Sequence, residues 1–181
     1  MNVKKLNPEA IVPTRGSEYA AGYDLYACLG KNGDLLNMVC INPNEVVKVK
    51  TGIAVAIPNA CFGGIFARSG LATKRGLRPA NCVGVVDSDY RGEVIVALHN
   101  DSDEPQYVYH GDRIAQLVIM PYYPVELNVV DELDTTERGD GGFGSTGVSL
   151  NDETSDSYEQ LSFFDILNKI AGDDKWQKQN D

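Results

Sequence analysis

Two acids and a tyrosine lie close together between two glycines near the middle of the chain. The segment Gly84 to Gly92 carries Asp87, Asp89 and Tyr90, and apolar residues precede and follow it. Because glycine and aspartate interrupt strand pairing and favour turns, the pattern predicts a β-hairpin with these three side chains at its turn. A carboxylate placed there can take a proton from water as a general base. An acidic surface turn without a catalytic role has the same composition.

A second group of residues is suited to binding an anion. Arg68, Ser69 and Gly70 follow an apolar run, and a short helix is expected from there through residue 75. A serine beside glycine at the start of a helix offers a hydroxyl and backbone N–H groups to an anion, although Ser69 also fits an ordinary helix cap. The same region holds the basic cluster of an otherwise acidic chain, made of Lys74, Arg75 and Arg78.

Two further features allow more than one interpretation. Asp24 lies in the apolar run Ala20 to Ala27, where a carboxylate either faces water at a strand edge or is held by a partner. The glycine-dense segment Glu137 to Gly147 fits either a flexible linker or a lid that orders over a phosphate. It resembles a P-loop in its glycines and its Ser-Thr pair, but it lacks the lysine and follows no strand.

Composition limits the class of protein. The 181 residues are 43% apolar, which suits one domain with a real core. A net charge of -10 argues against a nucleic-acid groove but not against a nucleotide ligand. The four cysteines form no C-x-x-C pair, no apolar signal segment follows Met1 to Lys5, and no run approaches the ~20 apolar residues of a membrane span. These features predict a soluble cytoplasmic protein with reduced thiols.

Strand-like runs recur along the chain with turn residues between them. They are expected at 3–6, 20–27, 45–50, 52–57, 62–67, 82–86, 93–98, 106–109, 114–120 and 125–130. Residues 29–44 are expected to form a loop or a loose hairpin, and residues 14–19 a loop. About ten short strands with little helix predict an all-β jelly roll or barrel over residues 1–131. A glycine-rich arm (132–147) and an acidic tail (148–181) are expected to follow it.

Five stretches, in the same order, resemble the motifs of the trimeric deoxyuridine triphosphate nucleotidohydrolase (dUTPase) family: residues 21–25, 67–71, 84–92, 111–117 and 138–147. The resemblance implies a jelly-roll subunit and a homotrimer with three shared active sites. It also implies Mg2+-dependent hydrolysis of dUTP to dUMP and pyrophosphate, which keeps uracil out of DNA and supplies dUMP for thymidylate synthesis. No contact with nucleic acid or with a membrane is expected.

The resemblance also assigns roles to single residues. Asp87 matches the general base that activates water for attack on the α-phosphorus. Mg2+ would be held mainly by the substrate's phosphates, and Asp24 would hold either the metal's waters or a partner arginine. The residues expected to bind substrate are Arg68, Ser69, Gly70, Asn81, Val85, Tyr90, Ile95, Gln116, Arg138, Phe143, Gly144, Ser145 and Thr146.

Within that set, the resemblance separates the uracil end of dUTP from its phosphate end. Asn81 and the backbone around Val85 would read the uracil edge in a pocket too tight for a thymine methyl group. Tyr90 would stack under the deoxyribose and leave no room for a 2′-hydroxyl. The motif around Ser69 and Gln116 would bind phosphates, with Ser69 near the scissile bridge. The arm would close over the site, with Phe143 above the uracil, Arg138 on the γ-phosphate, and Ser145 and Thr146 as further phosphate donors.

Two other functions fit parts of the sequence. A dCTP deaminase of the same fold needs a glutamate base on the strand after the central hairpin, and Val94 to His99 contains no acid. A protein that senses a nucleotide and docks partners through its tail is the second alternative.

Two segments depart from the family pattern. The connection over residues 28–44 is longer than usual, so it is expected to be either a surface insertion or a cover for a neighbouring subunit. The tail, 148–181, carries eight acids and three lysines, a net charge of -5. Its stretch Gln160, Leu161, Ser162, Phe163, Phe164 resembles the peptide with which bacterial replication proteins bind the sliding clamp. The same residues also fit an amphipathic helix that begins near Ser157.

Overall fold

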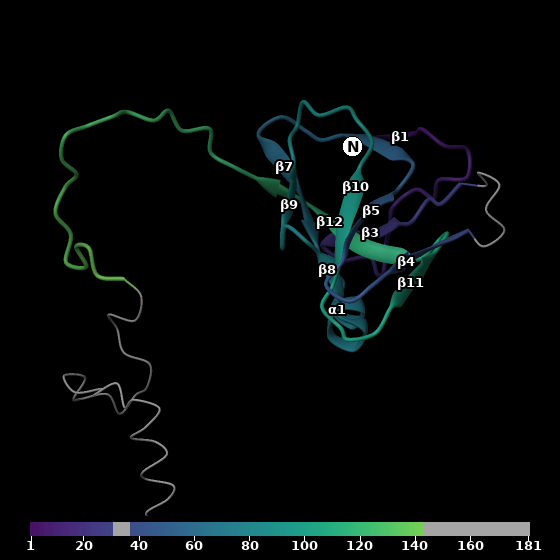
Figure 1. The fold of residues 1–181 in the computed structure, drawn as a ribbon. Coiled ribbons are helices and arrows are strands. Elements are labelled where there is room, and N and C mark those ends of the chain that lie inside the picture. The colour runs from purple at the N-terminus through teal and green to yellow at the C-terminus, as the bar shows by residue number, and fades with distance from the viewer. Residues whose placement is uncertain (31–36, 143–181) are drawn as a thin grey trace, which may run out of the picture. The chain divides into compact units, whose positions relative to one another are not determined.

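Strands dominate the described part of the chain, residues 1–30 and 37–142, in this computed structural model (Figure 1). A five-stranded antiparallel sheet has the order β2 (Thr14–Arg15), β3 (Gly22–Tyr26), β12 (Arg113–Pro121), β7 (Cys61–Phe66) and β9 (Gly84–Val86). A three-stranded sheet has the order β5 (Val46–Lys50), β10 (Ile95–Asn100) and β8 (Leu77–Pro79). Two strand pairs complete the set: β1 (Asn2–Lys5) with β6 (Ile53–Ala56), and β11 (Gln106–Tyr109) with β4 (Met38–Ile41). The predicted all-β jelly-roll class is confirmed.

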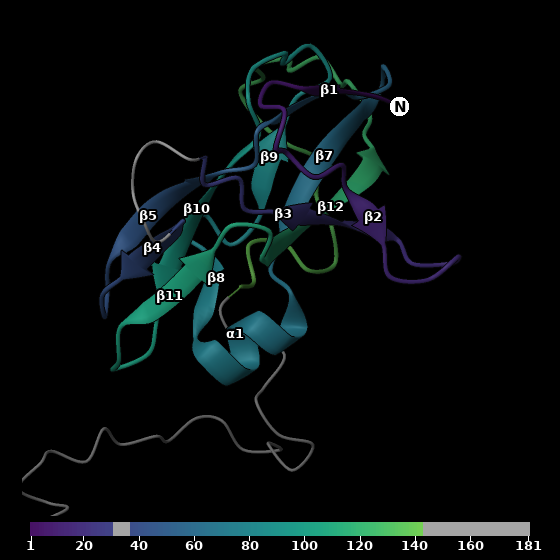
Figure 2. The same ribbon diagram turned by 90° about the vertical axis from the view of Figure 1, so that its right-hand side faces the viewer.

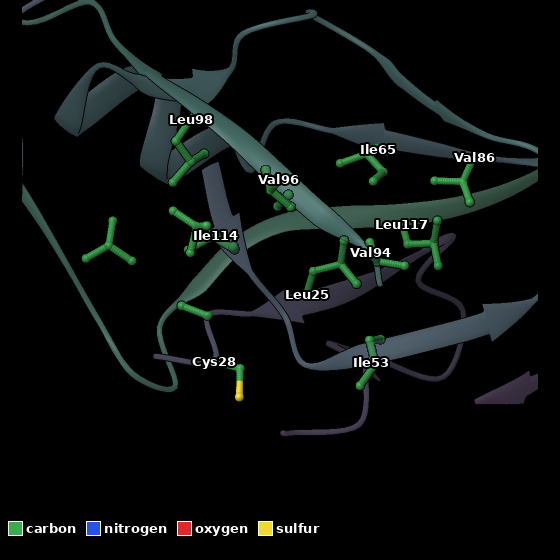
Figure 3. Packing of buried hydrophobic residues seen from close by; sticks show 14 of the residues in the cluster. Leu25, Cys28, Ile53, Ile65, Val86, Val94, Val96, Leu98, Ile114 and Leu117 are labelled. Carbon is green, nitrogen blue, oxygen red and sulfur yellow. The ribbon is translucent and has the colours of Figure 1, made fainter. Parts of the chain in front are cut away.

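Side chains from the two larger sheets fill one core (Figure 3). Along β10, Val96, Leu98 and Asn100 are buried, whereas the residues that alternate with them, Ile95, Ala97 and His99, are more exposed, as expected for a strand with one face on a core. Leu25 on β3 and Leu117 on β12 meet them from the five-stranded sheet and are fully buried. This packing fixes the register of every strand that ends near the predicted site.

The one helix among the described residues, α1 (Ser69–Arg75), follows β7 and occupies the range predicted for it (Figure 2). Arg68, in extended conformation, is the residue before the first turn, and no side chain caps the helix. Ser69 is therefore the first helical residue, and its interpretation as a helix cap is wrong. Gly76 ends the helix at φ +65, and its N–H donates to the carbonyl of Ala72.

The hairpin predicted around Asp87 is wrong in its pairing. β9 pairs with β7, whereas β10 pairs with β5 and β8, so the two strands belong to different sheets. Both carry inward-facing valines, such as Val86 and Val96, which lie in the core between the sheets. Burying both sets of valines in one core outweighs pairing the strands side by side, and the segment between them therefore connects two sheets.

Three other expectations fail. Residues 38–41, expected in a loop or a loose hairpin, form β4, which has Ile41 fully buried and pairs with the distant strand β11 instead of with a neighbouring strand of a hairpin. Residues 14–15, also expected in a loop, form β2 against β3. Residues 125–130, expected as a strand, lack strand structure; Val125, Leu127 and Val129 are 74%, 92% and 102% exposed. Alternating apolar residues make a strand only where a neighbouring strand is available.

The chain divides into two units, Met1–Leu127 and Asn128–Asp181. In the second unit the description ends at Gly142, so the predicted tail helix and clamp-binding peptide lie outside the described residues. All four cysteines lie in the described part and are free, as expected. Among residues 1–30 and 37–142, no helix has the length and apolar character needed to cross a membrane.

Candidate active site

A cavity of about 220 Å³ opens beside the edge strand β9. Ten residues line it: Ile65, Asn81, Gly84, Val85, Val86, Asp87, Tyr90, Glu93, Val94 and Ile95. They include Asp87, the predicted base, and four of the predicted substrate-binding residues. These predicted residues come from the turn after β8, from β9, from the connection after it and from the start of β10.

Local geometry shapes this cavity. A side chain at position 84 would meet the amide of Asn81 at 3.1 Å and Cβ of Ile65 at 3.2 Å, so glycine lets Asn81 lie close to β9. In the described chain β9 pairs only with β7, and its other edge keeps backbone groups free for a ligand. Val85 is exposed at this edge.

Hydrogen bonds within the connection fix the position of Tyr90. Its backbone N–H donates to the carbonyl of Asp87 at 3.2 Å, and its hydroxyl donates to the carbonyl of Glu93 at 3.0 Å. The ring folds over Gly92, where a Cβ atom would lie 2.5 Å from Cζ of the tyrosine. Arg91 donates to the carbonyls of Ser88 and Tyr90 and closes the turn. The carboxylate of Asp87 remains exposed at the mouth of the cavity.

A second group forms around Asp24, whose side chain is 13% exposed. Nε of Arg68 donates to Oδ1 at 2.8 Å, and Nη1 of Arg113 donates to Oδ2 at 3.2 Å. Arg68 also donates from Nη1 to the carbonyl of Arg113 at 3.4 Å. Asp24 is thus held by partners, and its interpretation as an unpaired edge acid facing water is wrong. One carboxylate between two guanidinium groups leaves a net positive charge.

The sheet register explains why these residues meet. Gln116 on β12 lies opposite Asp24 on β3 and Phe66 on β7. Its Nε2 donates to the carbonyl of Ala67 at 2.9 Å, which ties the predicted phosphate motif to β12. Ser69 and Gly70 follow directly and are exposed at the start of α1.

The two groups lie apart within one chain. Val86, just before Asp87, pairs with Gly63, and from there β7 runs three more residues to Phe66 before the motif at Arg68 begins. At a rise of ~3.3 Å per residue, this places Asp87 more than about 10 Å from Arg68. The site residues predicted in the first unit therefore separate into two groups. The cavity group is Asn81, Val85, Asp87, Tyr90 and Ile95. The arginine group is Asp24, Arg68, Ser69, Gly70 and Gln116, together with Arg113.

The arm residues belong to the second unit. Arg138 is exposed, and its Nε donates to the carbonyl of Gly141 at 2.9 Å within a tight turn. Gly139 adopts φ +53 there, a backbone conformation that favours glycine. Phe143, Gly144, Ser145 and Thr146 lie outside the described residues.

Two charged residues of these groups were not predicted, Arg113 and Glu93. Arg113 lies within the fourth motif, and its pairing with Asp24 depends on contact between β3 and β12, which the sequence does not show. Glu93 accepts the backbone N–H of Gly52 at 2.9 Å, and its Oε2 lies 3.9 Å from Nζ of Lys50. The only signal for Glu93 in the sequence was an acid at the start of an expected strand, close to a strand that carries a lysine.

The basic cluster predicted near α1 does not act as one unit. Arg78 pairs through two nitrogens with Asp101, at 2.5 and 3.0 Å, and this hydrogen bonding lowers the pKa of the Asp101 carboxyl. Nδ1 of His99 lies 2.8 Å from the same carboxylate and bonds to it only when that nitrogen carries a proton. Arg75 instead lines a second cavity with Arg68 and Arg113.

The described residues contain no group of three His, Cys, Asp or Glu side chains that could hold a metal ion. Asp24 already accepts from two arginines. Of the two acids that line the β9 cavity, Asp87 and Glu93, Glu93 already accepts the backbone N–H of Gly52. This donor set fits a metal that arrives on a ligand's phosphates better than one held by the protein.

Comparison with known proteins gives consistent results. The family model for dUTPase matches residues 8–147. The deoxyuridine 5'-triphosphate nucleotidohydrolase of Desulfitobacterium hafniense (strain DCB-2) is 50% identical over 139 residues, which cover 76% of this chain and 88% of that protein. The enzyme of the same name from Syntrophotalea carbinolica is 46% identical, over 81% of this chain and 96% of its own.

Solved structures agree with this result. A dUTPase mutant of Staphylococcus bacteriophage 80alpha, determined with dUpNHpp, superposes with a TM-score of 0.72 at 30% identity, over 81% of this chain and 98% of its own. A mutant dUTPase from phage phi11 of S. aureus, described with a structural Mg(II) ion, gives a TM-score of 0.61 at 27% identity, over 72% of this chain and 96% of its own.

Proposed function

Because this chain belongs to the dUTPase family and is a dUTP diphosphatase, we propose that the cavity beside β9 binds the nucleoside and that Asp87 starts the hydrolysis of dUTP. The observation that carries the proposal is the gathering of Asn81, Val85, Asp87 and Tyr90 around this cavity. The products are dUMP and pyrophosphate.

The cavity suits a pyrimidine without a bulky substituent. The free backbone edge of β9 and the side-chain amide of Asn81 supply donors and acceptors for the polar edge of uracil. Val85 and Ile95 line the same cavity, so a ring carrying an extra methyl group meets side chains. Tyr90, fixed through its hydroxyl, lies where a ribose ring would stack and crowds a 2′-hydroxyl.

Asp87 acts as general base in this proposal. Its carboxylate is exposed at the cavity mouth, so a water molecule can bind to it and give up a proton as it attacks the α-phosphorus. The bond between the α-phosphorus and the bridging oxygen breaks, and pyrophosphate leaves.

The arginine group binds the phosphates. Arg68 is held at Nε by Asp24 and at Nη1 by the carbonyl of Arg113, which leaves Nη2 for a phosphate oxygen. Ser69, Gly70 and Gln116 add donors beside it. When bound with the triphosphate, Mg2+ would supply positive charge that neutralises the phosphates. We assign Asp24 the role of holding arginines.

The separation of the two groups supports a site shared between subunits of a homotrimer. A nucleoside in the β9 cavity of one subunit would need the arginine group of another subunit to reach its phosphates, and the arm containing Arg138 to close the site. Co-expression of Asp87→Asn and Arg68→Gln chains tests this idea. If neighbouring subunits share a site, random mixing of the two chains gives about a quarter of the sites an intact Asp87 and an intact Arg68. If each site lies within one chain, no site has both residues intact, and every combination stays inactive.

The first experiment on the reaction measures pyrophosphate release from dUTP, dCTP, dTTP and UTP with Mg2+. Wild-type protein is expected to turn over dUTP alone, and Asp87→Asn is expected to lose activity on the order of 10²-fold or more while keeping its melting temperature. Full activity in Asp87→Asn would refute the assignment of the base. Binding of dUTP without cleavage would favour the nucleotide sensor, for which residues 160–164 are the candidate docking peptide.

A dCTP deaminase remains the weaker alternative. β10 and the residue before it, Val94 to Asn100, carry no acid that could serve as its base. Ammonia release from dCTP would be the result that favours it.

A further inference from the structure

The turn between β5 and β6 is bonded to the two residues that precede β10. Oγ1 of Thr51 donates to the carbonyl of Val94 at 2.5 Å, and the N–H of Val94 donates to the carbonyl of Ile53 at 2.9 Å. The N–H of Gly52 donates to Oε1 of Glu93 at 2.9 Å. Val94 and Ile53 are both buried in the core (Figure 3). Three hydrogen bonds and core packing therefore fasten the end of the connection that follows β9.

The turn itself is held by its surroundings. Thr51 is 1% exposed, so its hydroxyl bonds to Val94 away from water. A Cβ atom at position 52 would lie 2.8 Å from Cβ of Ala10 and 2.8 Å from Sγ of Cys28, so the turn has little room to shift on that side. The carbonyl at position 52 also accepts the N–H of Leu6 at 2.7 Å. The turn is therefore a fixed support for the residues bonded to it.

Glu93 connects this turn to Tyr90. Its carboxylate accepts the N–H of Gly52, and its backbone carbonyl accepts the hydroxyl of Tyr90 at 3.0 Å. The Glu93 side chain is 21% exposed, and its ion pair with Lys50, which is 67% exposed, adds little to the anchoring. The position of the Tyr90 ring therefore depends on a carbonyl that the turn holds in place.

The turn supports the β9 cavity without forming its surface. Tyr90, Glu93 and Val94 line the cavity, and neither Thr51 nor Gly52 is among the described residues that do. A side chain outside the lining can change the choice of substrate only by moving groups that belong to the lining. For Thr51, those groups are the two residues bonded to the turn and the tyrosine held by one of them.

We propose that Thr51 is a positioning residue for sugar specificity. Its buried hydroxyl holds Val94 and Glu93 in place, so that the carbonyl of Glu93 keeps the Tyr90 ring where a 2′-hydroxyl would lie. The inference rests on the proposed function, in which Tyr90 stacks under the deoxyribose. A ribonucleotide differs from the substrate by one hydroxyl, and a ring that can move aside accepts the larger sugar. Discrimination therefore requires that the ring be held by groups that are themselves fixed.

The test compares kcat/KM for dUTP with kcat/KM for UTP in the full-length protein, at enzyme concentrations high enough to measure UTP hydrolysis. Thr51→Val replaces the hydroxyl with a methyl group of similar size. It is expected to lower the preference for dUTP over UTP about fivefold, through the loss of one buried hydrogen bond. Thr51→Ser keeps the hydroxyl and is expected to keep the preference to within about twofold of wild type.

Ile41→Val is the matched control for stability. Ile41 is fully buried in β4 and lines neither of the two cavities. Removing one methylene group from a core destabilises a protein by an amount similar to the loss of one hydrogen bond. The melting temperature of Ile41→Val should therefore fall about as far as that of Thr51→Val, while its preference for dUTP over UTP stays unchanged.

Tyr90→Phe, which removes only the hydroxyl bonded to Glu93, separates this inference from the proposed function. A lower preference for dUTP in both Tyr90→Phe and Thr51→Val supports the inference. A lower preference in Tyr90→Phe alone overturns the role of Thr51 and leaves the sugar contact of Tyr90 standing. An unchanged preference in Tyr90→Phe overturns positioning through Glu93, and an unchanged preference in Tyr90→Ala would also refute the sugar contact itself.

Two further results concern the Thr51 variants alone. An equal loss of preference in Ile41→Val and Thr51→Val would assign the effect to general stability and overturn the inference. A loss in Thr51→Ser as large as that in Thr51→Val would do the same, because the serine keeps the hydroxyl. If Thr51→Val does not fold, Thr51→Ala replaces it, with the same expected loss, and an unchanged preference there overturns the role of Thr51.

Discussion

Replacing Asp24 with asparagine distinguishes the two roles proposed for this residue, orienting Arg68 or holding the waters of Mg2+. Asparagine keeps one oxygen, enough to accept from Nε of Arg68, but it turns an amide donor toward the donor Nη1 of Arg113. Two charge-assisted hydrogen bonds, at 2.8 and 3.2 Å, become at most one bond to a neutral acceptor. Each bond to a charged group is worth roughly 1.5–3 kcal/mol.

The contribution of Arg113 must be discounted because its side chain is 52% exposed. The remaining loss of about 2 kcal/mol corresponds to about a 30-fold fall in kcat/KM. If the carboxylate orients Arg68, the KM for dUTP rises and the Mg2+ concentration that gives half-maximal activity stays unchanged.

The assay is steady-state pyrophosphate release over a matrix of dUTP and Mg2+ concentrations. Asp101→Asn is the matched control, since it makes the same change in another arginine-paired aspartate outside both cavities. The reasoning is refuted if excess Mg2+ restores the activity of Asp24→Asn, because that outcome assigns the carboxylate to the metal's waters.

Three further predictions concern single side chains. Burial, with Glu93 and Glu9 as smaller contributors, raises the pKa of the Cys28 thiol. A thiol reagent should therefore label the exposed Cys82 at once and Cys28 only after unfolding. Cys82→Ser should abolish the fast phase of labelling. Because the pKa of Asp101 is lowered in the folded state, its contribution to stability is present above the usual aspartate pKa of about 3.9 and is lost as the pH falls through the lowered pKa of the folded state. The difference in melting temperature between wild type and Asp101→Asn should shrink below about pH 4, and a constant difference would contradict this. Gly92→Ala should displace the Tyr90 ring and lower the preference for dUTP over UTP by about tenfold; an unchanged preference would show that the ring does not exclude the 2′-hydroxyl.

The fold class was predictable because strands with one buried face leave an alternating pattern of apolar and polar residues in the sequence. β10 alternates outward and inward residues, and its position was predicted to within about two residues. β4 escaped prediction because asparagines and glycines flank a four-residue strand, and only its pairing with β11 reveals it. The prediction for residues 125–130 was wrong in the opposite way. Their apolar alternation suggested a strand, but the described chain offers no partner strand for it.

Pairing between distant strands was the information that the sequence lacked at the site. The types of Asp24, Arg68 and Gln116 suggested polar roles, but their contact depends on the order β3-β12-β7 in the sheet. For the same reason Arg113 was overlooked, although it lies within a motif that had been recognised. The residues predicted around Asp87 were easier to bring together because Asn81 to Ile95 lie within fifteen positions of one another in the chain.

The strand register also explains why Asp87 and Arg68 lie in two separate places within one chain. β9 runs antiparallel to β7, so as β9 advances toward Asp87, its partner β7 leads away toward Arg68. No change of side chain can bring Asp87 and Arg68 together, because their separation is set by the backbone pairing of β9 with β7. Valine and isoleucine side chains such as Val86 and Ile65 fix that pairing from within the core. The same burial that stabilises the subunit therefore supports the proposal that a second copy of the chain completes the site.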